Sequence, residues 1–185
     1  MRNKLLLSQI MFSVVGTVVF PYYLLILKNV GNAYGLFALL YALFSFSSAL
    51  TTLLLPTLTN KINIEILSSL SFMGMGIGFF VIPNINSLYL LFLLQTWNGV
   101  FQGLYKLAEK ELIKKENKSW QKSSYGLFFI QLFTTVCILS AGFLAETFTI
   151  HILFYIAGVL YFICGLVFVK RINKKYFRRQ KTTTS

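Results

Sequence analysis

The feature that most constrains this chain is the position of its basic residues relative to six long apolar stretches. All 17 Lys and Arg residues except Lys28 fall before the first stretch, at the second or fourth gap, or after the last stretch. Lys and Arg close to membrane spans are retained on the cytoplasmic side. The pattern therefore predicts a chain that crosses a membrane six times, with both termini in the cytoplasm.

The length of the apolar stretches predicts helices. About 20 apolar residues in a helix cross a hydrocarbon core, and backbone in lipid must satisfy its own hydrogen bonds. A content of 56% hydrophobic and 12% charged residues also differs from that of ordinary soluble domains. We expect an all-α integral membrane protein with a single six-span domain over residues 1–185 and a basic cytoplasmic tail at 170–185. The expected spans are residues 5–27, 34–58, 64–82, 88–107, 125–145 and 150–169.

The first span has a basic start that could also belong to a signal peptide. Its apolar run, residues 5–27, is long enough to cross the membrane, and no small-residue cleavage site follows it. We therefore expect this segment to be retained as a span.

Several functional classes are disfavoured by what the sequence lacks. The net charge of +12 is dispersed between apolar runs without a nucleic-acid-binding motif, so we expect no nucleic-acid partner. The sequence shows no metal-ligand cluster, phosphate-binding loop or nucleophile motif, which argues against an enzyme and against a cofactor. There is no Asp, and the five Glu residues fall in loops or at span ends, so no carboxylate is expected at mid-membrane.

Polar side chains form one-sided stripes on two of the expected spans. The stripe on the first span is Gln9, Ser13 and Thr17, and the stripe on the fourth is Gln95, Asn98 and Gln102. Spacings of three and four place each set on one helix face. Because amides are costly against lipid, these faces should turn to a bundle interior, a partner or a water-filled cavity. Hydrogen bonds between helices, worth about 0.6 kcal/mol each, are the alternative to a cavity lining.

Glycines recur at a spacing of four in the third and fourth expected spans. The pairs are Gly74 with Gly78 and Gly99 with Gly103. Pairs of small residues at this spacing let helix backbones approach closely in membranes. We expect both pairs to lie at helix contacts.

Together, the six spans, the two polar stripes and a tight basic turn after the second span resemble one half of a major facilitator superfamily transporter. The family's motif in that turn is Gly-x-Leu-Ala-Asp-Arg-x-Gly-Arg, and residues 56–64 read Pro-Thr-Leu-Thr-Asn-Lys-Ile-Asn-Ile. Leu58 and the basic Lys61 match, whereas Asn60 replaces the Asp and Asn63 replaces a glycine. The fourth-span motif Arg-x-x-Gln-Gly of drug-efflux members is similar to residues 95–99, which keep an amide and Gly99 but lack the arginine.

The resemblance implies a half-size transporter of a small organic solute in the plasma membrane, with efflux as the direction of its relatives. A complete transporter of the family has two such halves with the solute site between them. A single copy should expose its amide-bearing faces to lipid, so we expect a homodimer or a separate second half.

The resemblance implies a role for the polar stripes and for the turn after the second span. The expected solute path is lined by Gln9, Ser13, Thr17, Gln95, Asn98 and Gln102. Leu58, Asn60 and Lys61 are the expected cytoplasmic gate. The absence of Asp and of the motif arginine favours an alternative: a non-transporting membrane subunit, or a truncated remnant of a longer transporter.

Overall fold

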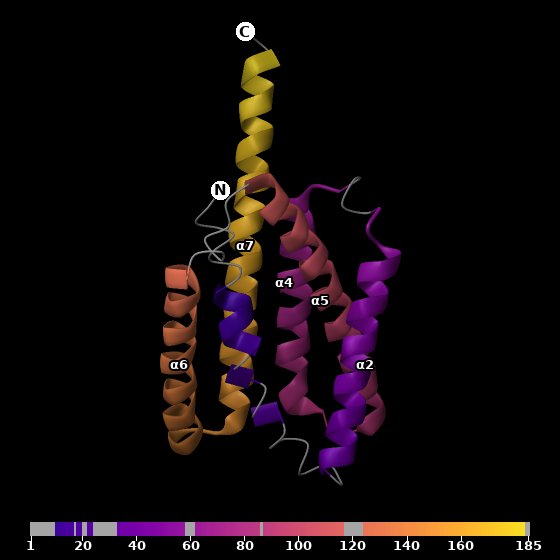
Figure 1. Cartoon of the computed structure of the whole chain (residues 1–185), viewed down its shortest axis with the longest axis vertical. Helices are drawn as coiled ribbons and strands as arrows, with labels where there is room; N and C mark the ends of the chain where they lie inside the picture. The colour runs from indigo at the N-terminus through magenta and orange to yellow at the C-terminus, as the bar shows by residue number, and fades with distance from the viewer. Residues whose placement is uncertain are drawn as a thin grey trace.

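A computed structural model describes residues 10–16, 18–19, 22–23, 33–57, 62–85, 87–116 and 124–183. Most of these residues lie in helices (Figure 1). Residues 10–16, 18–19 and 22–23 are helical and are called the N-terminal segment below. The helices that follow are α2 (Ala33–Leu54), α4 (Ile64–Val81), α5 (Leu88–Glu116), α6 (Ser124–Thr147) and α7 (Ile150–Thr183), with a short 3-10 helix η1 (Ile82–Asn84) after α4.

Four of the helices pack in the order α2, α5, α4, α7, each mainly against its neighbours in that order, whereas α6 makes only a limited contact with α7 (Figure 1). The N-terminal segment contributes Val15, Val19 and Tyr23 to the core that these helices share. Its Phe12 ring stacks on Tyr105 of α5 at a centroid distance of 4.3 Å. The core therefore lies between the N-terminal segment and the α2, α5, α4, α7 layer.

The contact between α2 and α5 depends on glycine. A Cβ atom at Gly99 would lie 2.5 Å from the carbonyl oxygen of Phe44, and one at Gly103 would lie 2.7 Å from that of Ser48. Real Cβ atoms do not approach a backbone atom so closely. The expectation that this glycine pair lies at a helix contact is confirmed.

Glycines also bring α4 close to both of its neighbours. Side chains at Gly74 and Gly78 would overlap residues of α5, which confirms the second expected pair. The indole nitrogen of Trp97 donates a hydrogen bond of 2.8 Å to the Gly74 carbonyl. On the other side, a Cβ at Gly76 would lie 3.2 Å from the carbonyl oxygen of Gly158 in α7. The helices on either side of α4 therefore approach its backbone directly.

The helix ends differ from the ends of the apolar runs. α2 ends at Leu54 rather than near residue 58, because Pro56 disfavours helical geometry at Leu55. α5 and α7 continue past the expected span ends at 107 and 169, to Glu116 and Thr183. The amide oxygen of Asn63 caps α4 by accepting a hydrogen bond of 3.3 Å from the Glu65 backbone N–H.

Three of the described helices are long and apolar enough to cross a membrane, at Tyr34–Leu54, Ile64–Asn84 and Ile150–Val169. α5 has sufficient length, but amide side chains interrupt its apolar run. Large apolar side chains such as Phe46, Leu139 and Leu166 are exposed on the outer faces of the bundle, as expected where a protein meets lipid. The described structure thus supports an all-helical membrane protein, and six spans stay a prediction.

Candidate functional site

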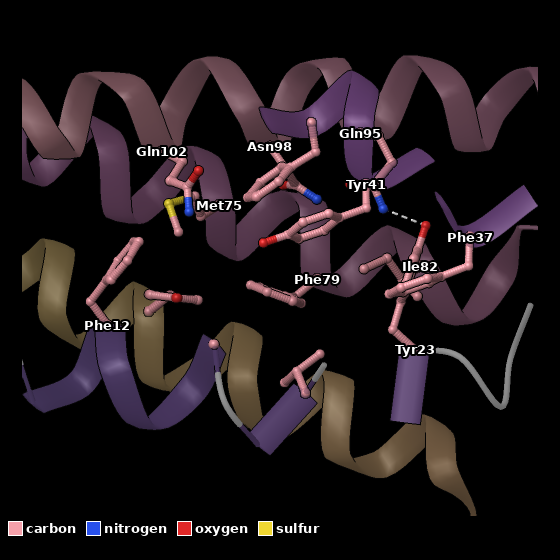
Figure 2. A pocket seen from close by; sticks show the side chains of 14 residues that line it. Phe12, Tyr23, Phe37, Tyr41, Met75, Phe79, Ile82, Gln95, Asn98 and Gln102 are labelled. Carbon is pink, nitrogen blue, oxygen red and sulfur yellow. Dashed lines mark hydrogen bonds between the residues drawn. The ribbon is translucent and has the colours of Figure 1, made fainter. Parts of the chain in front are cut away.

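A cavity of about 260 Å³ lies between the N-terminal segment and helices α2, α4, α5 and α7. It is called the central pocket below and is shown in Figure 2. Seven of the 14 side chains that line it are aromatic, and they come from the N-terminal segment, α2, α4 and α7. The pocket therefore combines apolar ring surfaces from four parts of the chain with whatever polar groups α5 supplies.

Helix α5 supplies the three amides that the sequence predicts on one face of the fourth span. Gln95, Asn98 and Gln102 all line the central pocket, and Figure 2 shows them extending from α5 on the same side. Gln95 is 8% exposed and Asn98 6%, while Gln102 is half-buried. Their spacing of three and four explains why one helix face carries all of them. Their role as a solute path stays a prediction.

The expectation that a single copy exposes its amides is wrong for Gln95 and Asn98. Both are buried within this one chain, because the N-terminal segment, α2 and α4 close around that face of α5. The need to shield these two amides therefore gives no reason for a second copy.

Gln95 has a partner inside the pocket. Its amide nitrogen donates a hydrogen bond to the hydroxyl of Tyr23, drawn as a dashed line in Figure 2. Because Tyr23 belongs to the N-terminal segment, this bond joins that segment to the N-terminal part of α5. Of the three amides, Gln95 thus links two parts of the chain that line the pocket.

Asn98 differs from Gln95 in that its carbonyl oxygen is buried without a hydrogen-bond partner among the described residues. The oxygen packs against Gly78, where any side chain would collide with it. Leaving a buried acceptor unsatisfied costs about 1–3 kcal/mol. The Asn98 carbonyl oxygen is therefore an unsatisfied acceptor enclosed against α4.

The central pocket carries no formal charge in the part of the chain that the structure describes. Its lining contains no Asp, Glu, Lys, Arg or His. The sequence has none of these residues between Glu65 and Lys106, or between residues 5 and 27. Among the described residues no group of His, Cys, Asp and Glu side chains could hold a metal ion. The described lining is therefore uncharged, with amide and phenol groups as its polar side chains.

The remaining predicted residues are not brought to the pocket. Ser13 is exposed and is absent from the described lining. Gln9, Thr17, Leu58, Asn60 and Lys61 lie outside the described residues. Their expected roles in the path and the gate stay predictions.

Sequence reasoning missed the aromatic part of the site. Phe12, Gly16, Val19 and Tyr23 all line the pocket and recur at spacings of four, three and four. That periodicity marks one face of a helix and could have identified them. The prediction of the site relied instead on the polar stripes, because amides are unusual in an apolar span.

The hydrogen bond between Gln95 and Tyr23 leads to a testable expectation. Gln95→Leu and Tyr23→Phe should each lower the thermal unfolding midpoint in detergent, and the double variant should lose less than the sum of the two. Interhelical bonds in membrane proteins give coupling energies of about 0.6 kcal/mol and at most about 1.7 kcal/mol. Strictly additive losses would show that the two side chains are not coupled.

One relative decides the family. A protein of Bacillus subtilis (strain 168), named "Uncharacterized MFS-type transporter YitZ", is 32% identical to this chain over 159 residues, which cover 84% of this chain and 96% of the relative. The chain belongs to the major facilitator superfamily. This confirms the resemblance found in the sequence. No family model matches the chain, and no solved structure matches it.

Membership of the major facilitator superfamily determines the general class of this protein. It is a membrane transporter by family and an all-helical, multi-pass membrane protein. The family points to transport rather than to enzymatic activity. For a superfamily member, a pocket lined with amides and rings is a natural place to look for a solute.

Proposed function

We propose that this chain is a half-size transporter that moves a small organic solute outward across the plasma membrane. The observation that carries the proposal is the convergence of Gln95, Asn98 and Gln102 with seven aromatic rings on one uncharged pocket. Pockets that bind small molecules are mostly apolar and contain a few converging polar groups. In a membrane transporter, such a pocket is a candidate site on the solute path.

The proposed path runs along α5. Lys106, one turn beyond Gln102, belongs to the set of cations that the charge pattern assigns to the cytoplasmic side. Gln95 and Tyr23 then lie toward the outer side, and their hydrogen bond closes the pocket there. On the inner side, Leu58, Asn60 and Lys61 would act as the gate that the family resemblance implies.

Counterflow in liposomes tests transport itself. Purified protein is reconstituted with an excess of one unlabelled solute inside, and uptake of the labelled solute is followed across a panel of small organic compounds. We expect transient accumulation of at least one solute above that in protein-free liposomes. If no compound in the panel accumulates, the alternative of a non-transporting membrane subunit is favoured.

The proposed transporter functions as two halves, most simply as a homodimer. Transporters of this family contain two six-span halves with the solute site between them. Ser13 and Gln131 are polar residues of the apolar stretches that stay exposed in one copy, and a second half could cover them.

Mass measurement tests the pairing. The protein purified in a mild detergent should have a protein mass of twice 21.1 kDa, measured by light scattering with the detergent contribution subtracted. The physical reason is that an amide exposed to lipid is costly unless a partner covers it. A mass of one chain, with no co-purifying membrane protein, would contradict the paired arrangement.

The six-span topology is part of the same proposal. Reporter fusions after residue 183 and within residues 114–124 should both report a cytoplasmic location, and a fusion at residues 83–87 should report an external one. An external location for the Lys114 region would overturn the proposed orientation.

A further inference from the structure

We propose that the end of α7 binds the headgroups of anionic phospholipids at the cytoplasmic surface of the membrane. The segment concerned is residues 170–183, which continue α7 beyond its apolar run Ile150–Val169 and are called the α7 extension below. Figure 1 shows the α7 extension projecting in line with α7 past the other helices. Binding does not require that the protein transports a solute; only the choice of membrane face follows from the proposed topology.

The α7 extension is basic and contains no acidic residue. Lys and Arg occur in pairs at 170–171, 174–175 and 178–179, and Lys181 follows. The sequence contains no Asp or Glu after Glu146. A helix neutralises its own cations with carboxylates three or four residues away, and α7 has none near these pairs. Any counter-charge therefore comes from outside this helix.

The spacing of the pairs adds mutual repulsion. Each pair lies four residues beyond the one before it, so the three pairs occupy one side of the helix on successive turns. Like charges four residues apart destabilise a helix. The helix dipole favours cations only in the last turn, whereas these pairs cover about three turns. A surface of anions beside this row of cations would relieve the repulsion.

Helix α5 ends at the same end of the bundle with a different charge pattern (Figure 1). Its residues 106–116 contain four Lys and three Glu, and the Lys114 ammonium lies 2.5 Å from a Glu111 carboxylate oxygen. The Lys106 ammonium donates a hydrogen bond of 3.2 Å to the Ser48 hydroxyl of α2. The end of α5 thus largely balances its own charge. Among the described helices at this end, α7 carries the largest unbalanced charge.

Depth identifies lipid as the source of the anions. A helix rises about 1.5 Å per residue, so residues 170–175 lie about 2–9 Å beyond Val169, the last residue of the apolar run. The headgroup layer on each side of the hydrocarbon core is about 5–8 Å thick. The first two basic pairs are therefore level with lipid phosphates, where a soluble acidic protein would have to displace lipid. Attraction to an anionic leaflet falls off within a Debye length of about 8 Å, so the pair at 178–179 contributes less.

Lipid binding by the purified full-length protein tests the proposal. Phosphatidylglycerol, an anion, and phosphatidylcholine, a zwitterion with the same acyl chains, are titrated separately into the protein in a neutral detergent. Bound lipids are counted by native mass spectrometry. We expect phosphatidylglycerol to bind about ten times more tightly than phosphatidylcholine, and the difference to shrink as the ionic strength rises. A role of the basic residues in topology alone predicts equal binding of the two lipids.

Two double variants locate the site, and each removes two charges. Lys170→Gln/Arg171→Gln acts next to the apolar run, and Arg178→Gln/Arg179→Gln acts about 14–15 Å beyond it. We expect the preference for phosphatidylglycerol to fall to about threefold or less in the first variant and to stay near tenfold in the second. In detergent the comparison does not depend on the orientation of the inserted protein.

Three outcomes would overturn the proposal. They are equal binding of the two lipids by the unmodified protein, a loss in the outer variant as large as that in the inner one, and displacement of phosphatidylglycerol by polyglutamate. The last outcome would assign the α7 extension to an acidic protein instead. The comparison of lipids on the unmodified protein decides the question even where a variant does not fold.

Lipid binding and transport can fail independently. Preferential binding of phosphatidylglycerol without counterflow of any solute would support the lipid site and contradict the proposed transport. Counterflow together with equal binding of the two lipids would have the opposite meaning.

Discussion

Replacing Gly99 by valine should lower the thermal unfolding midpoint of the purified protein more than any other single change considered above. A Cβ at this position would lie 2.5 Å from the carbonyl oxygen of Phe44 in α2. A backbone atom in a helix has no rotamer with which to move aside, so α2 and α5 would have to separate. Overpacking of a well-packed core costs about 1–3 kcal/mol, and we expect a value at the upper end of that range.

The matched control is Gly35→Val. Gly35 lies in α2, and a Cβ there meets nothing within 4 Å. The same change of residue type should therefore leave the midpoint close to that of the unmodified protein. If the two variants unfold at the same temperature, close contact at Gly99 is not what holds α2 against α5.

The second large expected effect is loss of transport in Asn98→Leu. Leucine has a similar shape to asparagine but offers neither donor nor acceptor. Loss of a hydrogen bond of about 1.4 kcal/mol corresponds to about tenfold in affinity, so counterflow of a solute that uses Asn98 should fall at least about tenfold at subsaturating concentrations. Thr96→Val on the same helix should transport normally.

The stability of Asn98→Leu separates a binding role from a structural one. The Asn98 carbonyl has no hydrogen-bond partner among the described residues, so its removal breaks no described bond there. Replacing an unsatisfied buried polar group by an apolar one of similar shape is neutral or stabilising. We therefore expect flux to fall while the thermal midpoint is unchanged or rises. A lower midpoint would identify Asn98 as a structural link between helices.

Much of the α5 part of the site was predictable because a single helix carries it. The spacing of Gln95, Asn98 and Gln102 defines a face without any knowledge of the other helices. Gly99 and Gly103 likewise predicted a close contact from their spacing alone. Periodicity within a helix is local information, and the sequence contains it in full.

What was not predictable depends on which helices become neighbours. The sequence does not show that the N-terminal segment and α2 close over Gln95 and Asn98, so their burial within one copy was missed. Glu65 was expected in a loop or at a span end; it lies in the first turn of α4 and is only 3% exposed, and that burial was not predicted. The ends of the apolar runs also did not predict the ends of the helices, because α5 and α7 continue into segments rich in Lys.

The glycine contacts of α4 and α5 bear on how the bundle can change shape. Between α2 and α5, and where Gly76 of α4 meets Gly158 of α7, backbone atoms of neighbouring helices approach each other directly; between α5 and α4, the side chains of Phe101 and Asn98 pack on the backbone of Gly74 and Gly78. Sliding or tilting at any of these interfaces would force atoms into a backbone, so these four helices should travel as one rigid body. Among the described helices α2, α4, α5, α6 and α7, α6 packs least extensively on its neighbours, so its displacement breaks the fewest contacts.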